Sequence, residues 1–264
     1  MMAILNVTPD SFSDGGKSFS VNDALRQAEK YIEEGADILD IGGESTRPNS
    51  TRVSAKEELE RVAPVIEAIA RRFEVPISID TTKAEVAESA INCGAEIIND
   101  VSGLRFDERI ALIAAKYKTG LILMHLRGDF EAMHKQKPVK DILREVSEGF
   151  RFSIEKAESY GVKKEQIALD VGIGFSKTFE QNIELIAKLD KIIGEFPTFP
   201  MMVGVSRKSF IGKILDDAPA VERLNGTLAA NTIAVWNGAH IVRVHDVKAA
   251  IEMLKVVEEI RKKI

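Results

Sequence analysis

Cysteine is almost absent from this chain of 264 residues. Cys93 is its one cysteine, so no disulfide can form within the chain, as is usual for proteins of a reducing compartment. Long apolar runs are lacking too, because no stretch approaches the roughly 18 residues that a membrane-spanning helix needs. The first residues also lack the basic and then apolar segments of a signal peptide. From these absences we expect a cytoplasmic protein with no membrane partner.

Basic residues are not in excess either. The chain has 36 Lys and Arg against 41 Asp and Glu, a formal net charge of −5, whereas general nucleic-acid binders are usually basic. We therefore expect no nucleic-acid partner. Hydrophobic residues make up 45% of the chain, enough for a sizeable core, and no linker or low-complexity tract divides it. This composition predicts one domain over residues 1–264.

Short apolar runs alternate with longer amphipathic segments along the whole chain. The runs are rich in Ile, Val and Leu without polar alternation, which is typical of strands buried on both faces. The expected strands are Ala3–Val7, Ala36–Ile41, Val75–Ile79, Ala95–Ile98, Gly120–Met124, Gln166–Leu169, Pro200–Val205 and Ala239–Val244. Eight helical segments, Lys56–Arg72 and Asn182–Leu189 among them, alternate with these runs. The count predicts an α/β fold, a single-domain (β/α)8 TIM barrel. An open doubly wound sheet is the alternative, but its usual GxGxxG turn is missing.

Polar side chains mark the ends of all eight expected strands. In a barrel these ends open on one face, which is where barrel enzymes place their sites. A single member of the set, such as Asp80 before Thr81 and Thr82, is also typical of a helix N-cap. Polar side chains at all eight strand ends favour a functional site over a series of helix caps. Its members are Asn6, Asp40, Asp80, Asn99, Asp100, His125, Asp170, Lys208, Arg243 and His245.

The chemistry of these groups suggests a ligand with two unlike ends. Carboxylate and amide groups, such as those of Asp80 and Asp170, suit a flat heterocycle that carries N–H donors. The cations Lys208 and Arg243, together with His245, suit phosphate or carboxylate. A nitrogen heterocycle that bears phosphates would satisfy both groups.

Seven segments, in order and over nearly the whole chain, resemble the signature motifs of dihydropteroate synthases. The motifs are residues 6–16 (NVTPDSFSDGG), 40–48 (DIGGESTRP), 78–81 (SIDT), 98–103 (INDVSG), 172–175 (GIGF), 206–210 (SRKSF) and 243–247 (RVHDV).

The resemblance implies a transferase of folate biosynthesis. It would join 6-hydroxymethyl-7,8-dihydropterin diphosphate to p-aminobenzoate, giving 7,8-dihydropteroate and pyrophosphate, and sulfonamides would target it. The resemblance also implies Mg²⁺ as cofactor, with Asn6 as a ligand, and a homodimer. The implied residues are Asp80, Asn99, Asp170, Lys208 and Phe175 for the pterin; Asn6, Thr46, Arg243 and His245 for pyrophosphate; Thr46, Arg47, Phe175 and Ser209 for p-aminobenzoate; and Lys208, Arg243, His245, Asp14 and Phe12 for catalysis.

Four departures from the family pattern stand out. Val171 replaces the usual proline, Ser176 replaces the usual glycine, and residues 125–129 are more charged than usual. Family members also usually carry a hairpin before the first strand, which here begins almost at Met1. A pterin-binding methyltransferase and a catalytically inactive pterin-binding homologue are the alternative functions. Neither needs the Ser206–Ser209 motif together with Arg243 and His245.

Overall fold

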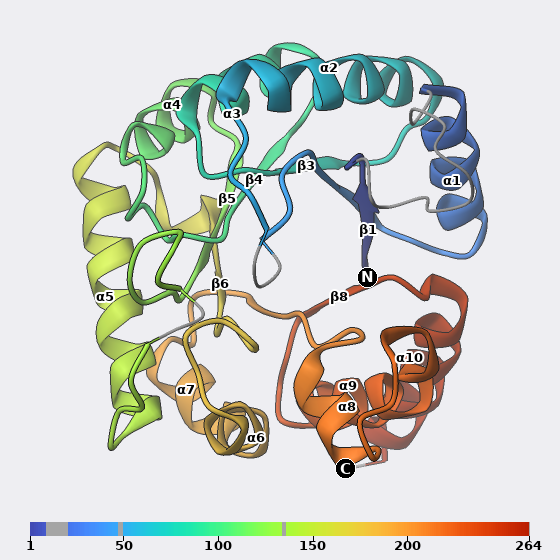
Figure 1. Cartoon of the computed structure of the whole chain (residues 1–264), viewed down its shortest axis with the longest axis vertical. Coiled ribbons are helices and arrows are strands. Elements are labelled where there is room, and N and C mark those ends of the chain that lie inside the picture. Colours follow the sequence, from blue (N-terminus) through green and yellow to red (C-terminus); the bar gives the residue numbers. More distant parts are fainter. Residues whose placement is uncertain (9–20, 47–49, 134–135, 264) are drawn as a thin grey trace.

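Eight parallel strands form a closed barrel in sequence order, β8 pairing back with β1 (Figure 1). The computed structural model describes residues 1–8, 21–46, 50–133 and 136–263. The predicted (β/α)8 barrel is therefore confirmed. The strands are β1 (Met2–Asn6), β2 (Ile38–Gly42), β3 (Ile77–Asp80), β4 (Ile97–Asp100), β5 (Gly120–Met124), β6 (Ile167–Asp170), β7 (Met201–Val203) and β8 (Ile241–Val244).

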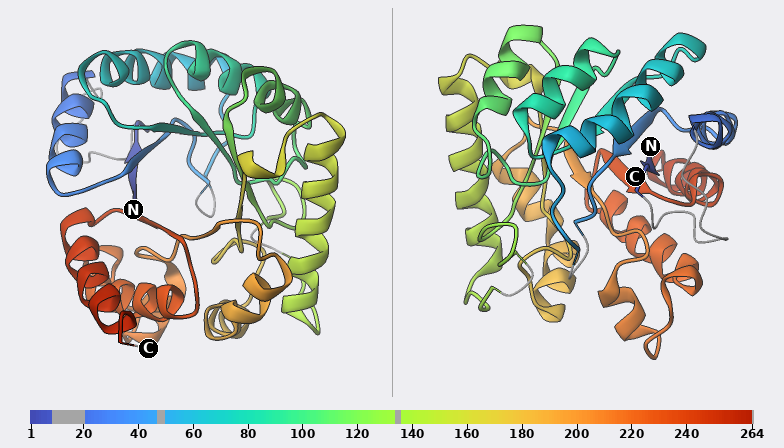
Figure 2. Two further views of the ribbon diagram at one scale, coloured as in Figure 1. Left: turned by 180° about the vertical axis from the view of Figure 1, so that it is seen from behind. Right: turned by 45° about the horizontal axis from the view of Figure 1, so that its top comes forward.

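The helices surround the barrel, as both views of Figure 2 show. No helix among the described residues has both the length and the apolar character needed to cross a membrane. The α-helices are α1 (Val21–Glu33), α2 (Ala55–Arg72), α3 (Ala84–Asn92), α4 (Arg109–Tyr117), α5 (Ile142–Ser159), α6 (Phe179–Ala187), α7 (Leu189–Glu195), α8 (Ser209–Ile214), α9 (Leu224–Trp236) and α10 (Val247–Arg261), and the 3-10 turns are η2 (Lys164–Gln166) and η3 (Ala220–Glu222).

The observed helix α6 begins three residues before the predicted helix Asn182–Leu189 and ends two residues before it. The helix begins at Phe179 because Thr178 accepts a hydrogen bond from the Gln181 N–H while the Gln181 side chain bonds back to the Thr178 N–H. It ends at Ala187, since Lys188 leaves helical geometry, and the short α7 follows.

Alternate residues of each strand face opposite sides of the barrel wall. One set packs against the helices and forms the large outer core. The other set fills the barrel interior, where Met2, Ile122 and Met202 are buried together with partly buried residues of four other strands. Asn6 has the same parity as Met2 and therefore continues this inward row at the carboxyl end of the barrel.

Candidate active site

The strand register brings polar residues together at the carboxyl mouth of the barrel. Asn6 pairs with Gly42, Gly42 with Asp80, and Asp80 with Asn99, so the four form one row across β1 to β4. Gly42 has no side chain, and a Cβ there would lie 3.4 Å from Asn6 Oδ1 and 3.5 Å from the Asp80 Cβ. The glycine therefore leaves space between an amide oxygen and a carboxylate.

Arg243 of β8 bridges two carboxylates of this mouth. Its Nε donates to Asp40 Oδ2 at 2.6 Å and its Nη2 to Asp80 Oδ2 at 2.8 Å. Asn99 Nδ2 also donates to Asp40 Oδ2, at 3.1 Å. Asp40 is completely buried, so these donors replace the hydrogen bonds to water that its carboxylate has lost.

Burial shapes the ionisation of this group. It raises the pKa of Asp80 to about 7, with Arg243 opposing the rise and Asp40 adding to it. Burial lowers the pKa of Arg243, but Asp40 and Asp80 outweigh it and the pKa is raised. Asp40 Oδ1 and Asn99 Oδ1 are buried and have no hydrogen-bond partner among the described residues. Buried polar atoms are normally satisfied, so these two acceptors suit a ligand that brings donors.

A second group forms where β6 and β7 end. Asp170 Oδ1 accepts from the Gly172 N–H at 2.7 Å. Lys208 Nζ donates to the Ile173 carbonyl and lies 4.6 Å from the centre of the Phe175 ring. Burial raises the pKa of Asp170 and lowers that of Lys208 to about 8, and each charge opposes the shift of the other. The pair therefore presents a carboxylate and an ammonium group beside an aromatic ring.

The segments after β7 and β8 hold each other in place. Ser206 Oγ accepts from the His245 N–H at 3.2 Å and lies 3.0 Å from His245 Nδ1. Arg207 pairs with Asp246 through two contacts of 3.0 and 2.5 Å. When the Ser206 hydroxyl donates to Nδ1, the neutral imidazole carries its proton on Nε2, a form that donates to a phosphate oxygen.

The remaining predicted residues lie around this mouth or outside the described residues. Thr46 follows β2 and is half-buried, whereas Ser209 begins α8 and is exposed. The predicted residues Phe12, Asp14 and Arg47 lie outside the described residues.

Two polar strand ends have structural contacts instead. The Asp100 carboxylate accepts from the Ser102 N–H and hydroxyl and from the Leu104 N–H, at 2.7 to 2.8 Å, and so shapes its own loop. The buried His125 ring packs on α5, where a Cβ on Gly149 would lie 2.4 Å from its Cδ2.

Comparison with known proteins decides the family. Residues 2–245 match the model of a family described as pterin binding enzymes. The dihydropteroate synthase of Synechocystis is 49% identical over 260 residues, which cover 98% of this chain and 89% of that protein. The chain belongs to the dihydropteroate synthase family.

Solved structures of dihydropteroate synthases support this family assignment. One from Clostridium difficile, determined in the presence of pteroic acid, is 44% identical with a TM-score of 0.91 and covers 98% of this chain and 95% of that one. One from Xanthomonas albilineans, with 4-aminobenzoic acid, is 39% identical with a TM-score of 0.92 and covers 98% and 92%. Dihydropteroate synthases are transferases of folate biosynthesis, so the predicted family, enzyme class and activity are confirmed.

Asp40 and Ser206 are the contributions that the sequence did not reveal. The strand-end position of Asp40 predicts no particular role, yet Asp40 is the buried carboxylate that accepts from both Arg243 and Asn99. Its inward parity, two residues before Gly42, was the available signal. Ser206 lay within a recognised motif, but its bond to His245, 39 residues away, is visible only in three dimensions.

Proposed function

We propose that this mouth binds a dihydropterin diphosphate and joins it to p-aminobenzoate. The pterin ring would donate to Asp80, Asn99 and Asp170, with Phe175 and Lys208 at the side of the ring. The proposal is carried by two buried acceptors beside the cation Arg243: Asp40 Oδ1 and Asn99 Oδ1 have no hydrogen-bond partner among the described residues. Pteroic acid and 4-aminobenzoic acid in the two related structures support this ligand pair.

The diphosphate would occupy the side of the mouth formed by Asn6, Thr46, Arg243 and His245. Among the described residues, Asp40 and Asp80 accept from Arg243 Nε and Nη2, which leaves Nη1 to donate to a phosphate oxygen. With the Ser206 hydroxyl donating to Nδ1, the His245 ring would donate to a phosphate oxygen through Nε2. Hydrogen bonds from Arg243 and His245 would stabilise the negative charge on the departing pyrophosphate.

Magnesium fits this mouth as a shared ion, not one held in a protein cage. The described residues contain no cluster of three His, Cys, Asp or Glu able to hold a metal. Mg²⁺ is usually bound by few protein oxygens together with substrate phosphates and water. Asn6 Oδ1, beside the space left by Gly42, is a suitable hard oxygen donor. When bound, the ion would neutralise charge on the departing pyrophosphate.

The reaction is a substitution at the pterin CH2 carbon. The carbon–oxygen bond breaks and pyrophosphate leaves with the electron pair. The amine lone pair of p-aminobenzoate forms the carbon–nitrogen bond, and the nitrogen then releases one proton. The protein supplies position and electrostatic stabilisation, with Lys208, Arg243 and His245 as the cationic and donor groups.

The p-aminobenzoate would contact Phe175, Thr46 and Ser209, with Ser209 at its carboxylate. Arg47, which lies outside the described residues, is the fourth residue proposed for this subsite. Phe12 and Asp14 complete the proposed catalytic set from the segment after β1. A sulfonamide, which has the same aromatic amine, would compete for this subsite.

One assay tests the proposal. Formation of dihydropteroate from the two substrates is followed with Mg²⁺ and with a chelator. We expect product that depends on both substrates and rises with Mg²⁺. Absence of product with Mg²⁺ and both substrates would refute the proposed reaction.

A homodimer is proposed from an apolar surface on α9 and α10, two helices that pack together. Ile233 and Trp236 on α9, and Val256 and Ile260 on α10, are each about half exposed. Their spacing of three and four residues places each pair on one face of its helix. We expect sedimentation to show a dimer, and Trp236→Glu with Val256→Glu to give monomers. An unchanged mass in that variant would place the interface elsewhere.

A further inference from the structure

Ser176 ties the segment after β6 to the segment between β5 and α5. Its Oγ lies 2.8 Å from the carbonyl oxygens of both Arg127 and Met133, one of which takes its proton. The same oxygen accepts from the Arg127 N–H at 3.2 Å. One buried hydroxyl thus joins two points of one segment to another.

The backbone conformation of Ser176 shows that its hydroxyl has a role separate from forming the turn. Its φ is +55°, in the left-handed region where a residue with a Cβ is disfavoured by about 1–2 kcal/mol. Glycine, the usual residue of the family pattern here, would adopt this turn without that cost. The turn itself therefore does not require serine, and the three contacts of Oγ are what serine adds.

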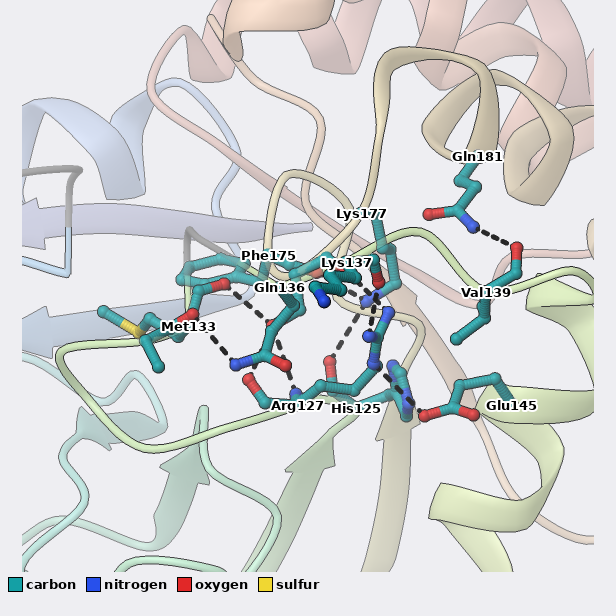
Figure 3. A network of polar contacts seen from close by, with 12 residues as sticks. His125, Arg127, Met133, Gln136, Lys137, Val139, Glu145, Phe175, Lys177 and Gln181 are labelled. Carbon is teal, nitrogen blue, oxygen red and sulfur yellow. Dashed lines mark hydrogen bonds and ion pairs between the residues drawn. The ribbon is translucent and has the colours of Figure 1, made fainter.

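Arg127 makes a second set of contacts between the same segments (Figure 3). Its Nη1 donates to the Ser176 carbonyl at 3.3 Å and its Nη2 to the Lys137 carbonyl at 2.6 Å. Its Nε lies 3.3 Å from Glu145 Oε1 of α5. Ser176 is therefore held through both its side chain and its carbonyl. We call Ser176 and Arg127 the latch.

Phe175 directly precedes Ser176 in the chain, and contacts with the segment between β5 and α5 also fix its position. Its carbonyl accepts from Lys177 Nζ at 2.9 Å, and Lys177 Nζ also lies 3.3 Å from the His125 carbonyl. The Phe175 ring packs on a small buried cluster, three of whose members belong to the segment after β5. The cluster is Val101, Met124, Leu126, Phe130 and Met133. Lys208 Nζ lies 4.6 Å from the centre of this ring.

We propose that the latch positions Phe175, and through it Lys208, against the pterin. Ser176 and Arg127 are positioning residues, since they act through Phe175 and do not touch the substrate. The inference rests on the proposed place of Phe175 and Lys208 in the pterin pocket. In this chain, the Ser176 hydroxyl connects two loops by hydrogen bonds. A glycine at this turn would have no side chain to make them.

A double-mutant cycle tests the latch. The affinity for 6-hydroxymethylpterin diphosphate is measured by calorimetry for wild type, Ser176→Ala, Phe175→Ala and the double variant. We expect Ser176→Ala to weaken binding about fivefold in the wild-type background and less than twofold when Phe175 is already alanine, because contacting groups are coupled. Equal losses in both backgrounds would overturn the latch.

Two further variants separate positioning from stability. Ser176→Gly also lacks the hydroxyl but relieves the left-handed backbone, so it should unfold at higher denaturant than Ser176→Ala yet bind the pterin as weakly. Ser153→Ala is the matched control, because Ser153 is equally buried and its hydroxyl donates to the Gly103 carbonyl at 2.9 Å. It should lose stability with unchanged affinity. Affinity that follows stability across the three variants would overturn the latch.

The cycle also distinguishes the latch from the proposed function. If Phe175→Ala weakens binding and Ser176→Ala does not, the latch is wrong and the proposed pocket stands. If Phe175→Ala leaves the affinity unchanged, the proposed place of Phe175 is wrong and the latch is refuted with it.

Discussion

Replacing Asp80 by asparagine should weaken pterin binding while leaving the barrel folded. The Asp80 carboxylate accepts from Arg243 Nη2 at 2.8 Å and ends β3 at the mouth. A hydrogen bond to a charged group contributes about 1.5–3 kcal/mol, and each 1.4 kcal/mol is tenfold in affinity. Because asparagine keeps a neutral acceptor, we expect the affinity for a pterin to fall about 10- to 100-fold.

The same substitution should change how stability depends on pH. The pKa of Asp80 is raised by burial from 3.8 to about 7, so the folded protein holds this proton more tightly than the unfolded chain. Its contribution to stability is full below about pH 4 and is lost as the pH rises through 7. Asparagine does not titrate, so the free energy of unfolding should decline less over this range. Asp100, whose pKa is raised to about 6 by burial, keeps part of the slope.

Calorimetry with a pterin analogue and urea unfolding at pH 5 and pH 8 measure these effects. At pH 8 we expect little loss of stability, because Arg243 keeps its ion pair with Asp40. Asp100→Asn is the matched control, since that buried carboxylate is fully engaged by its own loop. It should lower stability and leave the affinity of the folded protein unchanged. Unchanged affinity in Asp80→Asn would remove Asp80 from the pterin pocket.

Three further outcomes are expected. Ser206→Ala should impair use of the diphosphate substrate more than binding of a pterin without phosphates, because His245 loses its orienting bond; equal losses would contradict this role. Titration should show that p-aminobenzoate binds more tightly with pyrophosphate and Mg²⁺ present, because anchored pyrophosphate would complete the neighbouring subsite; equal affinities would mean that the subsite is preformed. Gly172→Ala should destabilise the fold by about 2–5 kcal/mol in urea unfolding, because its Cβ would lie 2.2 Å from the His125 carbonyl at a φ of +68°; a wild-type midpoint would refute this.

The sequence predicted the barrel well because each strand is a short buried run. All eight predicted strands overlap observed ones, and Gly120–Met124 matches to the residue. The short helix α7 was missed, since seven residues carry too little helical periodicity to stand out. Local sequence patterns indicate which residues are buried and how they are spaced, and this information was enough to predict the fold.

The site was predictable to a lesser degree. Strand ends identified the groups at the mouth, but residue type alone does not say which partner each one meets. Asp80 was also typical of an N-cap, yet it pairs with Arg243, and Lys83 occupies the N-cap position of α3. Asp100 had the same strand-end position but is engaged by its loop. These outcomes depend on contacts between distant parts of the chain.

The pairing of Arg243 with Asp40 and Asp80 has a consequence for synthesis of the chain. Arg243 follows the two carboxylates by 203 and 163 residues and lies on the last strand. On the ribosome, both acids emerge long before the guanidinium group that pairs with them. If the diphosphate binds at Arg243 as proposed, its site is complete only after β8 has been made, and a chain that stops before β8 should not hold the diphosphate. A pterin diphosphate added during refolding would bind only completed barrels and stabilise them by mass action, so its binding reports the yield of finished molecules.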